Sequence, residues 1–525
     1  MSDDDQRFGE RAALAATATA VLLMAATSVA APSVPFAPLA LAQGLVRIVP
    51  GGIATFFIEL LGHLALPLAA AGVGVGFLLA GKTLGRLVPW LRRVTGAGHA
   101  AATTLALSPL WAASVGLYPA DSVAVSLEVF ALVTAGAVIA GGFVGGSVGG
   151  SVVASASTAD GSAIADGATT AGGPPDPSRR RAFGWLALGV LGMLAGGAGS
   201  LLRRRPDPGE RLLDLGRLRR ASLPAGGDPE FASVAGLTPR ITSIPNFYVV
   251  DEALFDPDIE PLTWRLEVSG LVDRPLSLSY EQLSAMPAVE RYQTLECISN
   301  DVGGDLISTA RWAGVPLAHV LDLAGVRSGA VEVAFRSADG YSESHPIEAT
   351  KDPTTLLALG MNGHVLPRSH GFPARLLTVG TYGMKNPKWL MSIEVLDRPY
   401  EGFWERRGWS KTAMVKTGAR IDTPVAAVAG RATDVAGVAF AGDRGVASVE
   451  VSIDNGPWRA ALLETAASAF TWVRWRLPWT PQRPGIALLR SRAVDGTGVR
   501  QPADVTDPHP DGASGYHAIR VEVSE

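Results

Sequence analysis

The sequence is poor in cysteine and histidine, with one Cys, Cys297, and eight His among 525 residues. A single cysteine excludes an internal disulfide and a Cys₄ or Cys₂His₂ zinc site, and no Cys-x-x-Cys-His motif is present for covalent haem. The formal net charge of −4 argues against a nucleic-acid-binding protein. Two interpretations of Cys297 remain open: a small buried apolar residue, or a thiolate that acts as a nucleophile or as a single metal ligand.

Long hydrophobic runs are confined to residues 1–205, where charged residues are few. Five runs approach the ~20 residues that cross a bilayer. They are Ala12–Ala31, Gly52–Ala80, Ala100–Tyr118, Ser122–Gly145 and Phe183–Leu202. Basic residues precede the first run and lie in alternate loops, which predicts a cytoplasmic N-terminus. An odd number of spans then places the rest of the chain outside, so we expect a multi-pass protein of the bacterial cell membrane with an extracytoplasmic C-terminal part.

The segment 146–177 consists almost entirely of Gly, Ser, Ala, Thr and Pro, which predicts a flexible cytoplasmic linker. After it, Arg180 and Arg181 are separated by one residue from Phe183, where a weakly apolar run begins. This arrangement is typical of a twin-arginine export signal. The alternative is an ordinary positive-inside anchor, which needs no special sequence.

The remainder of the chain divides into two patterns. Residues 206–411 mix alternating strands, as in "LTWRLEVSGLVDRPLSLSY", with short helical segments such as "YEQLSAMP", which predicts an α+β domain. A strand with an Asn-Gly turn is expected in "TTLLALGMNGHVLP". Residues 412–525 consist of short alternating strands separated by turns, which predicts an all-β sandwich.

Several separated motifs in residues 240–525 resemble the sulfite oxidase family of molybdenum enzymes. "TLECISN" is similar to the family's molybdenum-cysteine loop, and "GGDLISTARWAGVPL" to the stretch that follows it. "MNGHVLPRSHGFPARLLTVGTYGMKNPKWL" is similar to its pterin-binding segment. "GVASVEVSIDNGPW" and "RAVDGTGVRQP" resemble its immunoglobulin-like C-terminal domain, which allows a homodimer through residues 412–525.

The resemblance implies that Cys297 is the protein ligand of molybdenum, while molybdopterin supplies the other sulfurs. A soft, charged thiolate suits molybdenum. The positions that match cofactor contacts are Asn246, Tyr248, Val249, Ser337 (with Asp339 as an alternative), His370, Arg375, Asn386 and Lys388. Arg375 can hold the pterin phosphate in a fork, and Lys388 adds a point charge. The implied activity is two-electron oxygen-atom transfer on a small oxidised sulfur or nitrogen compound.

The family's pair of substrate-binding arginines is replaced by Asp301 and Val302, which predicts poor use of sulfite. For b-type haem, the spans offer His63 and His99, which are better explained as packing or interfacial residues. Electrons are therefore expected to pass to a separate electron-transfer protein or a quinone-linked subunit. The competing hypothesis is a membrane-anchored binding or sensor protein that has lost the cofactor. The presence of Cys297, Arg375 and Lys388 together argues against it.

Overall fold

The computed structural model divides into two units, Met1–Arg205 and Pro206–Glu525. In the second unit it describes residues 206–215, 218–219, 229–251 and 256–525. In the first it describes 10, 13–14, 16–18, 72, 75–76, 78–80, 82–95, 102–103 and 106–107.

The described part of the first unit centres on a basic helix, α5 (Val88–Thr95), preceded by the 3₁₀ turn η2 (Gly85–Leu87). Arg86 pairs with Glu10 at 2.5 Å. Among the described residues, no helix is both long enough and apolar enough to span a bilayer. The first three predicted spans are described only in part. The last two spans, the linker 146–177, the Arg180–Arg181 pair, His63 and His99 lie outside the described residues.

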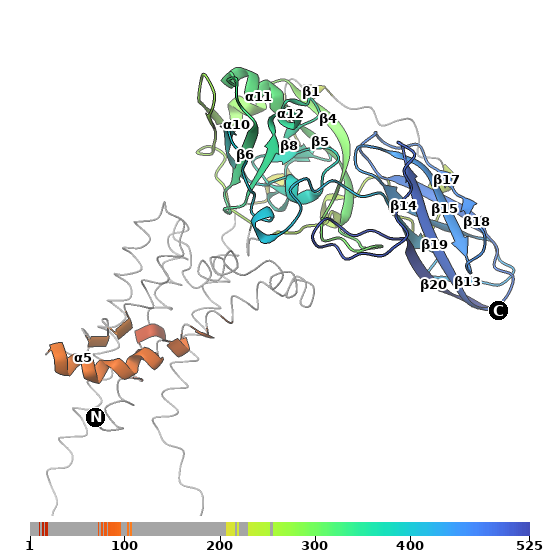
Figure 1. The fold of residues 1–525 in the computed structure, drawn as a ribbon, viewed down its shortest axis with the longest axis horizontal. Helices are drawn as coiled ribbons and strands as arrows, with labels where there is room; N and C mark the ends of the chain where they lie inside the picture. Colours follow the sequence, from red (N-terminus) through yellow and green to blue (C-terminus); the bar gives the residue numbers. More distant parts are fainter. Residues whose placement is uncertain are drawn as a thin grey trace, which may run out of the picture. The chain divides into compact units, whose positions relative to one another are not determined.

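The first half of the second unit contains two mixed sheets (Figure 1). One sheet has the order β1-β4-β5-β8-β10, with β9 paired to β8. Its strands are β1 (Leu218–Arg219), β4 (Ala288–Glu296), β5 (Ile307–Pro316), β8 (Leu356–Met361), β9 (His364–Val365) and β10 (Arg375–Leu377). The other sheet has the order β3-β2-β11-β6-β7. Its strands are β2 (Arg265–Gly270), β3 (Leu276–Ser279), β6 (Glu332–Ser337), β7 (Ser342–Pro346) and β11 (Leu390–Leu396).

Short helices and 3₁₀ turns lie between these strands. They are α9 (Pro229–Ala232), α10 (Tyr280–Ser284), α11 (Leu317–Ala324) and α12 (Ile347–Lys351), with 3₁₀ turns η3 (Pro208–Glu210), η4 (Ile244–Asn246), η5 (Arg368–His370), η6 (Gly383–Lys385) and η7 (Glu405–Arg407). Helices α11 and α12 pack on the core between the sheets, whereas α9 packs on β18 (Val473–Trp479). Helix α11 shows why the sequence folds this way. Its apolar residues Leu317, Val320, Leu321 and Ala324 follow helical spacing, and all are buried in the shared core. The helix ends at Gly325, which has a φ of 71°.

The expected strand pairs of this half are present. Strands β2 and β3 form an antiparallel hairpin within 262–280, followed by α10 with a Ser279 capping box. Strands β6 and β7 pair in the same way. The Asn-Gly turn joins β8 to β9, with positive φ at Asn362 and Gly363. The α+β prediction for this part of the chain is therefore confirmed.

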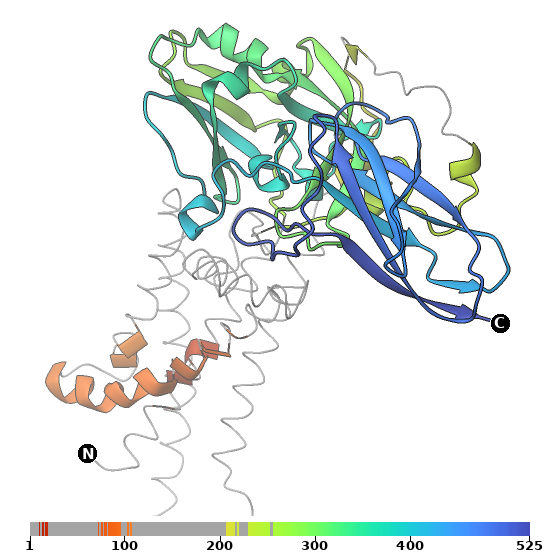
Figure 2. The ribbon, with the colours of Figure 1, turned by 45° about the vertical axis from the view of Figure 1, so that its right-hand side comes forward.

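The second half is built from strands alone, in two sheets that share one core around Trp475 and Leu489. Figure 2 shows these strands in blue, turned from the view of Figure 1. One sheet orders β12 (Gly418–Thr423), β14 (Thr433–Phe440), β18 (Val473–Trp479) and β17 (Leu462–Leu463). The other orders β13 (Ala426–Val428), β20 (His517–Ser524), β19 (Gly485–Asp495), β15 (Val446–Ile453) and β16 (Arg459–Ala460). This two-sheet arrangement agrees with the predicted sandwich.

Helix α11 allows a test of the core with a matched control on the same helix. Leu321 is 1% exposed, whereas Leu323 is 40% exposed. We expect Leu321→Ala to lower the free energy of unfolding by about 2–5 kcal/mol, because it leaves a cavity between the sheets. Leu323→Ala is expected to change it by no more than about 0.5 kcal/mol. Denaturant unfolding of both variants in the full chain measures the difference, and equal losses would show that α11 does not close this core.

Candidate functional site

Cys297 follows the last residue of β4 and begins a tight turn. The turn is closed by a hydrogen bond from the Asn300 N–H to the Cys297 carbonyl at 3.1 Å, and the Cys297 N–H donates to the Leu306 carbonyl at 2.9 Å. The side chain is buried. Strand β4 is paired with β5 from Val289 to Glu296, the residue before the cysteine. The thiol is therefore held on rigid backbone rather than on a free loop.

Asn300 fixes the loop that follows the cysteine. Its Oδ1 accepts from the Leu306 N–H at 2.9 Å, and its Nδ2 donates to the Glu296 carboxylate at 3.0 Å. A Cβ on Gly304 would lie 2.4 Å from this Oδ1, so a glycine is required for the close approach. These contacts join both ends of the loop to the residues beside Cys297.

The environment of the Cys297 sulfur has two opposing effects on its ionisation. Burial raises the pKa of the thiol, while a hydrogen bond with the Ser299 hydroxyl lowers it. The Cys297 Sγ and Ser299 Oγ lie 3.0 Å apart. A bound metal would favour the thiolate strongly over the thiol. The position thus suits a metal ligand better than a free nucleophile in solvent.

Arg375, the first residue of β10, is a buried cation whose hydrogen-bond partners are neutral. Its two terminal nitrogens donate to the carbonyls of His370 at 3.2 Å and Asn386 at 3.1 Å. Among the described residues its Nε has no partner, and the guanidinium lies 5.3 Å from the centre of the Trp312 ring. Burial lowers the pKa of Arg375 to about 10, so the group is still charged at pH 7. This arrangement suits an anionic group that is not part of the chain.

His370 and Lys388, two further positions expected to contact the cofactor, lie beside Arg375. Gly371, with a φ of 110°, makes this possible, because a Cβ there would lie 2.9 Å from the Lys388 Cβ and 3.0 Å from the Arg375 Cβ. Lys388 forms an ion pair with Asp251 and donates to the Ser369 carbonyl at 2.8 Å. Burial, with Arg375 and Lys388 nearby, lowers the pKa of His370 to about 3, so it is neutral at pH 7.

Tyr248 connects this basic group to Cys297. Burial raises the pKa of the Tyr248 hydroxyl, the Cys297 thiolate adds to the rise, and Arg375 opposes it. The Tyr248 ring stacks on Phe247, which contacts the same Trp312 ring that Arg375 contacts. A Cβ on Gly383 would lie 2.7 Å from the Tyr248 hydroxyl and 3.3 Å from the Glu296 carbonyl. The flanking residues Asn246 and Val249 are exposed. Cysteine, tyrosine and arginine thus converge on one place.

The remaining predicted positions have different surroundings. Ser337 is buried at the end of β6, and among the described residues its hydroxyl has no hydrogen-bond partner. The N–H of the next residue, Ala338, bonds to the Trp389 carbonyl, one residue beyond Lys388. Asp339 accepts from the Tyr341 N–H at 3.0 Å and shapes the turn. The Asn386 amide is used internally, accepting from the Thr378 N–H at 2.7 Å and donating to the Tyr382 carbonyl at 3.0 Å.

The sequence reasoning missed the residues that hold the site together. Lys385 looked no different from Lys388, yet it is buried between Glu343 at 2.6 Å and Glu405 at 2.8 Å. Ser299 and Asn300 lie inside the cysteine motif, but their side chains were not assigned a role. Glu405 is 20 residues from Lys385 in the sequence, so no helix or strand spacing could have predicted that they pair.

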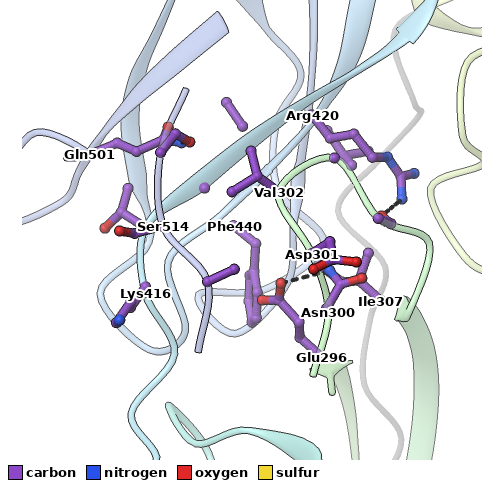
Figure 3. A pocket seen from close by; sticks show the side chains of 18 of the residues that line it. Glu296, Asn300, Asp301, Val302, Ile307, Lys416, Arg420, Phe440, Gln501 and Ser514 are labelled. Atoms are coloured by element: carbon purple, nitrogen blue, oxygen red, sulfur yellow. Dashed lines mark hydrogen bonds between the residues drawn. The ribbon is translucent and has the colours of Figure 1, made fainter. Parts of the chain in front are cut away.

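A cavity of about 60 Å³ lies next to the cysteine loop (Figure 3). Residues Glu296, 300–304 and Ile307 line one side, and strands and loops of the C-terminal half line the other, with Tyr382. Glu296, Asp301 and Val302 line it, with Phe440 from β14. Arg420 also lines it, but its guanidinium is bound to Asp422 at 2.7 Å and to the Gly304 carbonyl at 2.8 Å. Burial raises the pKa of Glu296 to about 7.

Comparisons with known proteins agree with this geometry. Residues 253–404 match the oxidoreductase molybdopterin binding domain. The uncharacterized oxidoreductase YuiH of Bacillus subtilis is 34% identical over 154 residues, which cover 29% of this chain and 76% of that protein. Mouse mitochondrial sulfite oxidase is 30% identical over 53% of this chain and 59% of its own length.

The catalytic subunit MsrP of the protein-methionine-sulfoxide reductase of Gluconobacter oxydans is 33% identical over 32% of this chain and 59% of its own length. The chain thus spans 59% of the length of the sulfite oxidase and of the reductase subunit. The buried Arg375 Nε and Ser337 hydroxyl, which have no partner among the described residues, fit a phosphate-bearing cofactor, and Cys297 fits its metal. The chain belongs to the molybdopterin-binding oxidoreductases, and its cofactor is molybdenum–molybdopterin.

Proposed function

We propose that this oxidoreductase transfers an oxygen atom, with two electrons, to or from a small sulfur or nitrogen oxide. The observation that carries the proposal is the convergence of Cys297, Tyr248 and the buried Arg375 at one site. Cys297 would hold the molybdenum, and Arg375 with Lys388 the pterin phosphate. When bound, the molybdenum supplies the two-electron redox chemistry. The chain supplies binding, orientation and exclusion of water.

The expected charge of the substrate is inferred from the charged side chains that line the cavity next to the cysteine loop. Asp301 is exposed there and Val302 is half-buried. Two cations line the cavity: Arg420 is bound to Asp422, and Lys416 donates to the Gly512 carbonyl at 2.7 Å and lies 3.9 Å from Asp511. An anionic substrate would therefore meet a carboxylate instead of a free guanidinium. We infer that the preferred substrate is neutral, such as an S-oxide or N-oxide, rather than the sulfite dianion.

The location of the enzyme is also part of the proposal. The five apolar runs and the distribution of basic residues in the sequence support a multi-pass anchor with the catalytic unit outside the cell membrane. An external catalytic unit needs an electron partner at the membrane, either a separate electron-transfer protein or a quinone-linked subunit. A homodimer through residues 412–525 is a further proposal that the sandwich allows. The alternative, a cofactor-free binding or sensor protein, predicts no molybdenum in the purified chain.

Replacing Arg375 with glutamine tests the phosphate contact. We expect Arg375→Gln to bind the cofactor about one to two powers of ten more weakly, so that less cofactor is retained when its concentration is limiting. The loss corresponds to one charge-assisted hydrogen bond of ~1.5–3 kcal/mol. Molybdenum analysis and pterin fluorescence of the purified variant measure the loss. Because the substitution removes a buried charge, the cofactor-free variant should be no less stable than the cofactor-free parent.

The matched control for this variant is Arg336→Gln, which breaks a partly exposed ion pair with Glu394. It should keep the full cofactor content. Normal molybdenum in Arg375→Gln would contradict the assignment of the phosphate site. Absence of molybdenum from the unaltered protein, after expression with an intact cofactor pathway, would favour the cofactor-free alternative.

Sulfite turnover tests the charge argument at the cavity. Two missing charge-assisted contacts, each worth ~1.5–3 kcal/mol, should weaken sulfite binding by roughly two to four powers of ten relative to a dedicated sulfite oxidase. Asp301→Asn should raise kcat/KM for sulfite severalfold without the same gain for a neutral sulfoxide. Asp305→Asn removes an exposed carboxylate of the same loop that does not line the cavity, and should have little effect. Efficient sulfite oxidation by the unaltered enzyme would disprove this inference.

The export route is tested by replacing Arg180 and Arg181 with lysine. The positive charge is kept, so a simple topology signal would survive. A twin-arginine signal would not, and molybdenum-loaded protein should then remain with its catalytic unit in the cytoplasm. Protease accessibility of intact spheroplasts, combined with molybdenum analysis, measures this outcome. If the double variant still presents a loaded catalytic unit outside, the arginines act only on topology.

A further inference from the structure

Ser299 makes a direct contact with the sulfur of Cys297. The two atoms, Ser299 Oγ and Cys297 Sγ, lie 3.0 Å apart. The residues are the first and third of the turn that the Asn300 N–H closes onto the Cys297 carbonyl. Ser299 is half-buried, so the contact is partly shielded from water.

The position of the Ser299 backbone is set by its neighbours in the turn. On one side, Ile298 is buried in a cluster with Tyr382 and Met384. On the other, Asn300 is fixed by hydrogen bonds to Glu296 and to the Leu306 N–H. Fixed neighbours on both sides hold the Ser299 backbone in place, so its short side chain stays within reach of the Cys297 sulfur.

The chemistry of the pair gives the hydrogen bond one direction once a metal is bound. A metal-bound cysteine is a thiolate, which has no proton to donate, so the Ser299 hydroxyl must donate to the sulfur. Such a donor withdraws electron density from the sulfur. Reduction adds negative charge to the metal and its ligands, so the hydrogen bond stabilises the reduced state more than the oxidised one.

We propose that Ser299 is a positioning residue for the metal ligand, which orients the Cys297 sulfur and raises the reduction potential of the bound molybdenum. The inference rests on the proposed cofactor site and goes beyond it, because it concerns the electron-transfer properties of the centre rather than its presence. The sequence "CISN" places no other hydroxyl within two residues of the sulfur.

The test is a series of variants that grades the donor strength at one position: Ser299→Thr, Ser299→Cys and Ser299→Ala. Thr keeps the hydroxyl, Cys offers a weaker S–H donor, and Ala offers none. The readouts are the reduction potential of the purified holoenzyme and the wavelength of its sulfur-to-molybdenum charge-transfer absorption. We expect the potential to fall, and the band to move to longer wavelength, in the order Ser and Thr, then Cys, then Ala.

Ser452→Ala serves as the control, because it removes another buried serine hydrogen bond, to the Gly456 carbonyl at 2.8 Å, in the C-terminal sandwich. It should shift neither readout. An unchanged band and potential in the molybdenum-loaded Cys and Ala variants would overturn the proposed role of Ser299 and leave the proposed function standing. If the Ala variant does not bind molybdenum, the reduction potentials and absorption bands of the Ser, Thr and Cys proteins still test the proposal. An unaltered protein without molybdenum would overturn the proposed function, and this inference with it.

Discussion

The site depends on one buried positive charge, the guanidinium of Arg375. Removing such a group from water costs several kcal/mol unless an opposite charge or a full set of acceptors replaces the solvent. Here the chain provides two carbonyls and leaves the Nε without a partner among the described residues. The folded chain therefore carries an uncompensated desolvation penalty at Arg375, which a bound anion would offset. Such an unpaired buried charge is expected at a binding site and is not expected in a core built only for stability.

Comparison with Lys385 makes the meaning of this unpaired charge clearer. Lys385 lies ten residues from Arg375 and is equally buried, but it contacts two glutamates, Glu343 and Glu405. Its charge is satisfied within the protein, and it ties η6 to β7 and η7. Burial of a cation alone thus does not identify a ligand site. The decisive feature is whether the chain itself supplies the counter-charge.

This distinction explains how much could be predicted from the sequence. Alternating patterns gave the hairpins and the all-β half, because each depends on neighbours within a few residues. The motifs gave Cys297, Arg375 and Lys388. They could not separate Lys388 from Lys385, or show that the Asn386 amide is used to bind Thr378 and Tyr382, because those partners are chosen by tertiary packing. The cavity was also unpredictable, since strands more than 100 residues away form one of its sides.

The cysteine turn separates two regions of opposite electrostatic character. On the pterin side, Arg375 and Lys388 surround the place where an anionic cofactor would bind, and burial keeps their fields strong. On the cavity side, Asp301 is exposed and the guanidinium of Arg420 is neutralised by Asp422. The same short turn can therefore favour one anion, the cofactor, and disfavour another, an anionic substrate. Charge selectivity in this enzyme then comes from how individual cations are paired, since Arg375 has no carboxylate partner among the described residues and Arg420 has one, and not from the net charge of the chain.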